Sequence, residues 1–203
     1  MALATPDAWK KRKRQKMRSL ARDRERGLVD DQIMPILRIL NSLDGYFTTS
    51  SCAGRIVLLE TPRIGDKLNA KLCATWHREV DAGEVRERLS EYLRGLGGGG
   101  RELWFISQGP IVHVSARDLD SAIKLREVAF SSGFKKSGIL SISEKGVLLE
   151  VLSTERMDVP IVKDGVKLVG DEYIDFLVEK ANNALRRSLK KLKLLKNKLE
   201  SMM

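Results

Sequence analysis

From Asp171 to Met203 the chain contains neither glycine nor proline, the two residues that most often interrupt a helix. The segment opens with the acids of DEYID and closes with the bases of KKLKLLKNKLE, an order that suits the dipole of a helix. It therefore predicts one long closing helix. The residues before it follow a different pattern.

The rest of the chain alternates helical segments with strand-like runs. Residues 7–26 contain no helix breaker and predict a basic helix that ends near Gly27, and Asp30 is a candidate cap for a second helix. Two more helices are expected, at 81–100 and from the candidate cap Asp118 to Gly133. The runs that predict strands are 46–60 (two strands around a small polar centre), 71–80, 102–107, 111–117, 137–143, 146–154, 157–162 and 165–170.

Neighbouring strands joined by short turns favour antiparallel pairing. We therefore expect an α+β fold: a mostly antiparallel or mixed sheet, flanking helices and the long C-terminal helix, in a single domain over 1–203. A doubly wound parallel sheet is the lesser alternative. Gly95, Gly97 and Gly100 match G-x-G-x-x-G by letter, but a helix precedes them and a strand follows. A dinucleotide-binding turn needs the reverse order, so a flexible linker is expected there.

The net charge of +10 is gathered at the two ends of the chain. Residues 1–26 carry ten bases and three acids (+7), and 186–203 carry seven bases and one acid (+6), which leaves 10 − 13 = −3 for 27–185. Basic ends of this kind commonly meet nucleic acid, whose phosphates release counterions on binding; solvated helix ends are the plainer alternative. The bases expected to contact nucleic acid are Lys10, Lys11, Arg12, Lys13, Arg14, Arg186, Arg187, Lys190 and Lys191.

Several classes of protein are disfavoured by composition. No run of 18 apolar residues is present, and the basic N-terminus lacks the apolar core of a signal peptide. Two cysteines without a CxxC pair indicate a reduced, cytoplasmic protein, and two isolated histidines predict no metal site.

The octet TTSSCAGR (48–55) is the densest group of candidate functional side chains. Cys52 as a nucleophile would need a base within reach; His77 or His113 could supply it, but nothing in the spacing demands it, so packing is its expected role. The hydroxyls, the small residues and Arg55 suit an anion-binding turn. A hairpin turn that satisfies its own backbone is equally compatible, and the same two readings apply to SGFKKSGI (132–139).

Five blocks in order resemble a known family. YFTTSSCAGRI (46–56), HVSAR (113–117), SGFKKSGI, LSTERMDVPI (152–161) and EYIDFLVEKAN (172–182) are similar to the signature of the tRNA wybutosine-synthesising protein 3 family. The resemblance covers roughly 27–185, which it makes the catalytic body, with 1–26 as a basic helical arm and 186–203 as the basic end of the last helix. One departure is SQGPIVH, where an acid is expected beside the proline.

The resemblance implies an S-adenosylmethionine-dependent methyltransferase with an α+β fold that is not the Rossmann type. Its implied substrate is phenylalanine tRNA, methylated at N4 of the 4-demethylwyosine-type (7-aminocarboxypropyl-demethylwyosine) tricyclic base beside the anticodon. His77 and His113 are the candidate general bases. The residues expected to bind the cofactor are Ser50, Ser51, Gly54, Arg55, Arg117, Ser137 and Gly138. A non-enzymatic RNA-binding module of the same fold is the alternative function.

Overall fold

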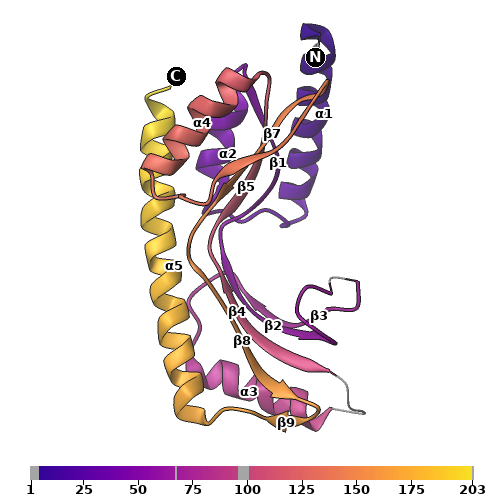
Figure 1. Cartoon of the computed structure of the whole chain (residues 1–203), viewed down its shortest axis with the longest axis vertical. Coiled ribbons are helices and arrows are strands. Elements are labelled where there is room, and N and C mark those ends of the chain that lie inside the picture. The colour runs from indigo at the N-terminus through magenta and orange to yellow at the C-terminus, as the bar shows by residue number, and fades with distance from the viewer. Residues whose placement is uncertain (1–4, 67, 96–100, 203) are drawn as a thin grey trace. The chain divides into compact units, whose positions relative to one another are not determined.

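The computed structural model describes residues 5–66, 68–95 and 101–202, and Figure 1 follows their helices and strands along the chain. The helices are α1 (Pro6–Glu25), α2 (Met34–Ser42), α3 (Ala82–Arg94), α4 (Leu119–Ser131) and α5 (Asp171–Glu200). The strands are β1 (Tyr46–Cys52), β2 (Arg55–Thr61), β3 (Lys71–Trp76), β4 (Glu102–Gln108), β5 (Ile111–Ala116), β6 (Gly138–Ser143), β7 (Gly146–Leu152), β8 (Arg156–Lys163) and β9 (Val166–Lys167).

The strands form two antiparallel sheets, in the orders β1-β5-β7-β6 and β3-β2-β4-β8-β9. The expected α+β class and the long final helix are confirmed, and the parallel-sheet alternative is wrong. Within the described residues, no helix is long and apolar enough to cross a membrane.

The chain divides into two compact units, each assembled from separate segments. The first unit comprises Met1–Ala53, Pro110–Thr154 and Ser188–Met203, and the second comprises Gly54–Gly109 and Glu155–Arg187. Each unit contains one of the sheets and one buried apolar cluster. That the whole chain acts as a single domain stays a prediction.

The octet does not form a hairpin. β1 pairs with β5 in the first unit, whereas β2 pairs with β3 and β4 in the second, so the chain changes sheet between Ala53 and Gly54. Gly54 has φ +104°, and a Cβ there would lie 2.9 Å from the carbonyl oxygen of Gln108. Only glycine combines that backbone angle with so close an approach, which explains the residue without a ligand.

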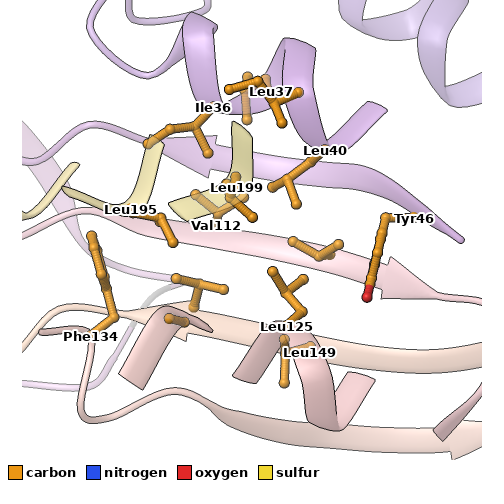
Figure 2. Close-up of a cluster of buried hydrophobic side chains, with 14 of the residues drawn as sticks. Ile36, Leu37, Leu40, Tyr46, Val112, Leu125, Phe134, Leu149, Leu195 and Leu199 are labelled. Carbon is orange, nitrogen blue, oxygen red and sulfur yellow. The ribbon is translucent and has the colours of Figure 1, made fainter. Parts of the chain in front are cut away.

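In the first unit, helices cover both faces of the sheet. Figure 2 shows one face, where Val112 and Leu149 pack against Leu37 of α2, Leu125 of α4 and Leu195 of α5. On the other face α1 packs across the start of β1: the Trp9 and Phe47 ring centroids lie 4.7 Å apart, and the Trp9 indole donates to the Asp44 carbonyl at 2.9 Å. Figure 1 shows α1 and α2 on opposite sides of this sheet.

The second unit has its own core. Its sheet contributes buried side chains such as Leu58 and Phe105, which join Leu89 of α3 and Ile174 and Leu177 of α5 in one cluster. This arrangement uses the first part of α5, whereas the leucines near its C-terminus belong to the cluster of the first unit. Because neither Gly nor Pro interrupts α5, this one helix contributes buried side chains to both clusters.

Two expected helix starts have different outcomes. Asp118 caps α4 as predicted, since its carboxylate accepts from the Ser121 N–H at 2.8 Å. Asp30 does not cap α2: that helix starts at Met34 without a side-chain cap, and the Asp30 carboxylate instead accepts from the Ala53 N–H at 2.7 Å. At the end of α3, Gly95 is the C-cap, while the predicted glycine linker over 96–100 lies outside the described residues.

Candidate functional site

A row of four residues crosses the sheet of the first unit, one from each strand. Ser50 of β1 pairs with His113 of β5, His113 pairs with Glu150 of β7, and Glu150 pairs with Gly138 of β6. The Ser50 Oγ lies 2.8 Å from His113 Nδ1, and His113 Nε2 lies 3.1 Å from Glu150 Oε1. Both ring nitrogens of His113 are therefore held by side chains of the neighbouring strands. We call these four residues the cross-strand row.

A β-bulge brings Ser50 to this position. Thr48 pairs with Val114 and Ser50 with His113, so Thr49 is an extra residue without a partner in the register. Side chains alternate between the faces of a strand, and without the extra residue Thr49 would stand opposite His113. Bulges re-aim side chains in this way and are common beside active sites. Here Thr49 donates its hydroxyl to the His113 carbonyl oxygen at 3.3 Å.

A cavity of about 310 Å³ opens beside the row. Its walls are α1, the loop that follows it and β1, with Lys16, Ser19, Leu20, Asp23, Leu28, Val29, Thr48, Thr49, Ser50 and Ser51 as lining residues. Ser50 thus faces the cavity and also contacts His113. Four consecutive hydroxyl residues, one ammonium and one carboxylate give the cavity groups that can bind both ends of a zwitterion.

The other expected cofactor residues of the first unit have different surroundings. Ser137 is buried, and its hydroxyl donates to the Phe134 carbonyl oxygen at 2.7 Å and accepts from the Leu152 N–H at 3.2 Å. These two hydrogen bonds to the backbone give the Ser137 hydroxyl a structural role in the turn before β6. Gly138 stands in the row itself, where a Cβ would meet nothing within 4 Å.

Arg117 lies at the far end of β5 from the row. Its backbone N–H donates to the Gly45 carbonyl at 2.9 Å, and its Nε lies 3.2 Å from the Asp118 carboxylate. It lines a separate cavity of about 510 Å³ with Lys10 and Lys13 of α1. Within the first unit, the structure therefore brings Ser50, His113 and Gly138 together but not Arg117.

Three of the expected catalytic and cofactor-binding residues belong to the second unit. Gly54 is explained by its close approach to Gln108, and Arg55 at the start of β2 donates from Nε to the Gln108 side-chain oxygen at 3.3 Å. His77 is exposed after the end of β3, in an open pocket of about 590 Å³. That pocket is lined by Thr75, Trp76, His77, Arg78, Glu84, Glu87 and Arg88.

The pocket around His77 is rich in charge. Arg78 makes a two-pronged contact with the Glu84 carboxylate at 3.0 and 2.6 Å, and Glu84 also accepts from the Asp81 N–H at 3.2 Å in the capping box of α3. The hydrogen bond from Arg78, helped by the Asp81 backbone, lowers the pKa of Glu84 to about 2. The guanidinium and carboxylate are thus paired with each other.

The five expected nucleic-acid contacts on α1 divide into two groups. Lys10, Lys11 and Arg14 are exposed. Arg12 lies over the Phe47 ring, 5.5 Å from its centroid, and donates to the Lys145 carbonyl. Lys13 donates to the Leu43 carbonyl at 2.5 Å, and desolvation, partly opposed by the charge of Asp44, lowers the pKa of its ammonium.

The four expected bases on α5 are exposed or half-buried, and three of them have polar contacts in the structure. Arg186 pairs with Glu79, and Arg187 lies 3.9 Å from Glu155, both in the second unit. In the first unit Lys191 donates to the Thr154 hydroxyl at 2.9 Å, and Lys190 is exposed.

Sequence reasoning missed Glu150. The run GVLLEVL places one acid among alternating apolar residues, which indicates that it faces away from the core, as it does here. Its partner follows only from the register of β5 against β7, and a sequence pattern does not fix that register.

The comparisons with known proteins agree with one another. The sequence matches the family described as "Methyltransferase TYW3" over residues 11–201. A relative from Pyrococcus horikoshii, named "tRNA(Phe) 7-((3-amino-3-carboxypropyl)-4-demethylwyosine(37)-N(4))-methyltransferase 1", is 44% identical over 194 residues, which cover 96% of either chain. A relative from Methanocaldococcus jannaschii, named as the same methyltransferase, is 37% identical over 177 residues, or 87% of this chain and 89% of its own.

Two solved structures are also similar. "Structure of PH1069 protein from Pyrococcus horikoshii" has a TM-score of 0.87 at 44% identity and covers 96% of this chain and 97% of that one. A hypothetical protein from Aeropyrum pernix has a TM-score of 0.73 at 32% identity and covers 86% and 99%, respectively.

Proposed function

The chain belongs to the Methyltransferase TYW3 family, and from that premise we propose that it methylates N4 of the 7-(3-amino-3-carboxypropyl)-4-demethylwyosine base of phenylalanine tRNA, with S-adenosylmethionine as donor. The names of the relatives support the substrate. The observation that carries the proposal is the cross-strand row, in which a serine hydroxyl faces a polar cavity and contacts a histidine. A base linked to such a cavity suits a reaction in which a ring nitrogen loses a proton.

The cavity beside Ser50 suits the methionine end of S-adenosylmethionine. Lys16 and the Ser51 hydroxyl would bind its carboxylate, and the Asp23 carboxylate would bind its ammonium. The hydroxyls of Thr48, Thr49 and Ser50 already contact Asn41, the His113 carbonyl and the His113 ring, respectively. A volume of about 310 Å³ falls at the low end of small-molecule sites, roughly 300–1,000 Å³. The fit therefore concerns the amino-acid end of the donor, and the expected roles of Gly54, Arg55, Arg117 and Ser137 in binding it stay predictions.

The bound donor supplies an electrophilic methyl group, so the protein needs no covalent nucleophile and Cys52 needs no catalytic role. Cys52 is half-buried in β1, opposite Ile111. The remaining tasks of the protein are to orient the tricyclic nucleobase, to exclude water and to accept the proton of N4. Ser50 and His113 are the groups we assign to that proton. His77, exposed in its charged pocket, is the second candidate base.

Exposed bases are the proposed contacts with the anticodon stem-loop. Lys10, Lys11 and Arg14 of α1 and Lys190 of α5 present ammonium and guanidinium groups to solvent, where phosphates can reach them. Arg12, Lys13 and Lys191 already contact neighbouring protein groups, and we assign them the smaller share of binding. In this proposal 27–185 is the catalytic body of one cytoplasmic enzyme, and the two basic ends serve it.

A labelled-methyl assay tests the proposal. Purified protein is incubated with S-adenosylmethionine carrying a labelled methyl group and with phenylalanine tRNA isolated from cells that accumulate the demethylated tricyclic base. The proposal predicts label in that base and none in tRNA that carries unmodified guanosine. Salt-sensitive tRNA binding without transfer, together with no heat of S-adenosylmethionine binding in calorimetry, would instead indicate the RNA-binding module.

A further inference from the structure

Glu150 contacts His113 and is not among the residues that line the cavity beside Ser50. We infer that Glu150 is a positioning residue, which holds His113 in the tautomer with the proton on Nε2 and so leaves Nδ1 to accept the Ser50 hydroxyl. The catalytic consequence of this inference rests on the proposed function, whereas the tautomer itself does not.

The hydrogen-bonding capacity of each group decides the direction of both bonds. An ionised carboxylate only accepts, so the 3.1 Å contact requires His113 Nε2 to donate to Glu150 Oε1. A neutral imidazole has one N–H, and Nδ1 is then an acceptor. The Ser50 hydroxyl at 2.8 Å must therefore donate to Nδ1. The other tautomer would set the Nε2 lone pair against a carboxylate oxygen, which is repulsive.

Partial burial strengthens this arrangement. The side chains of His113 and Glu150 are 26% and 21% exposed, so water competes for their hydrogen bonds less than it does at the surface. All three side chains extend from paired strands of one sheet, and the Thr49 hydroxyl ties the bulge to the His113 backbone. The pairing of the strands therefore fixes the positions of the Ser50–His113 and His113–Glu150 hydrogen bonds.

The arrangement provides a route for the proton of the methylated nitrogen. The N4–H bond breaks as the N4–CH₃ bond forms, and the electrons of the S–CH₃ bond remain on the sulfur of the donor. The N4 proton passes to the Ser50 oxygen while the Ser50 proton passes to His113 Nδ1. The resulting imidazolium faces the Glu150 carboxylate and later returns the proton to water, as in other carboxylate–histidine pairs.

The tautomer is measured directly by ¹⁵N–¹H correlation of the imidazole rings. The chain has only two histidines, so the spectrum is simple and His77 serves as an internal control. At about pH 9, where imidazoles are ordinarily neutral, the wild-type protein should show His113 protonated on Nε2. In Glu150→Gln the amide can donate to Nε2, so a substantial Nδ1–H population should appear while the His77 signals stay unchanged.

Activity gives the second readout. Glu150→Gln should lower kcat by about 10- to 100-fold with KM for S-adenosylmethionine changed less than about threefold, because the change alters proton transfer and not donor binding. Glu150→Asp keeps an acceptor-only carboxylate and should recover part of the loss and the Nε2–H tautomer. Glu144→Gln removes an exposed carboxylate from the β6–β7 turn of the same sheet and is the matched control, expected to behave as wild type.

The outcomes separate the two proposals. If the wild-type protein transfers no methyl group but His113 is the Nε2–H tautomer and loses it in Glu150→Gln, the proposed function fails and the assignment of Glu150 stands. If the wild-type protein is active while Glu150→Gln leaves kcat and the His113 tautomer unchanged, the assignment is overturned. If the Glu150→Gln protein unfolds, the Glu150→Asp variant and the tautomer of the wild-type protein test the assignment instead. A wild-type His113 protonated on Nδ1 would overturn the assignment of Glu150.

Discussion

The two histidines of the chain have contrasting environments. His113 lies in the middle of a sheet, with both ring nitrogens contacted by side chains of adjacent strands. His77 follows the end of a strand and is exposed in an open pocket among charged residues that pair with each other. The difference teaches that a strand register can place hydrogen-bond partners at both ring nitrogens of a histidine.

The largest effect is expected at His113 itself. His113→Gln should lower kcat for methyl transfer by about 100-fold or more, because it removes the group proposed to accept the proton. Ser50→Ala combined with His113→Gln should cost little more than His113→Gln alone, since residues that act as a unit are not additive. Single-turnover transfer of labelled methyl measures both. A kcat within about threefold of wild type would place the base elsewhere, with His77→Gln as the next variant to measure.

The exposed and the engaged bases of α1 can be separated by salt titration. Replacing Lys10, Lys11 and Arg14 by alanine should reduce the slope of log Kd for tRNA against log salt by about 2 to 3, because each phosphate contact contributes roughly 0.7 to 0.9. The matched variant, Arg12→Ala with Lys13→Ala, should change the slope by less than about 1 and should instead lower the melting temperature, since both residues contact the first unit. Equal slopes of log Kd against log salt for the two variants would contradict the division of the α1 bases into exposed and engaged groups.

Alanine substitutions at two glycines compare a position that requires glycine with one that has room for a side chain. Gly54→Ala in the second unit should lower the free energy of unfolding by about 1 to 3 kcal/mol, because alanine is strained at φ +104° and its Cβ would crowd the Gln108 carbonyl. Gly138→Ala in the first unit should change stability by less than about 1 kcal/mol, since nothing lies within 4 Å of the new Cβ. Urea unfolding of the two variants measures the difference, and equal stability would contradict it.

The smallest effect concerns acid stability beside His77. The folded pKa of Glu84 lies at about 2, below the ordinary 4.5, so its stabilising contribution is complete above about pH 4.5 and is lost as the pH falls toward about 2. Glu84→Gln should therefore lower the melting temperature at neutral pH and lose that difference from wild type on acidification. Glu87→Gln, an exposed neighbour on the same helix, is the control. A difference that stays constant with pH would contradict the pairing of Glu84 with Arg78.

Sequence patterns predicted where helices and strands lie along the chain better than which strands pair with each other. The breaker-free run after Asp171 and the Asp118 cap were sufficient to locate α5 and the start of α4. The division of the octet between two sheets was not predictable, because a short turn between two strands ordinarily indicates a hairpin. The chain departs from that rule at Gly54, where the backbone angle and the approach to Gln108 depend on strands distant in sequence.

The candidate site was predictable in part. The chemistry of the octet and the family resemblance predicted Ser50, His113 and Gly138 as site residues, and the structure brings them into one row. Glu150 was missed because its contact with His113 depends on the β5–β7 register, and the orientation of the Ser50 side chain depends on a bulge that no residue type specifies. Ser137 shows the converse: its chemistry suited a ligand, but its hydroxyl is used by Phe134 and Leu152.

Chemical-shift mapping with S-adenosylhomocysteine, the demethylated donor, tests most directly that the cross-strand row borders the reaction centre. Backbone amide signals are recorded as the compound is added to the full-length protein. We predict the largest changes at Thr48–Ser51 and at His113 and its neighbours in β5. Changes confined to the residues around His77 and α3, with the signals of β1 and β5 unmoved, would contradict it.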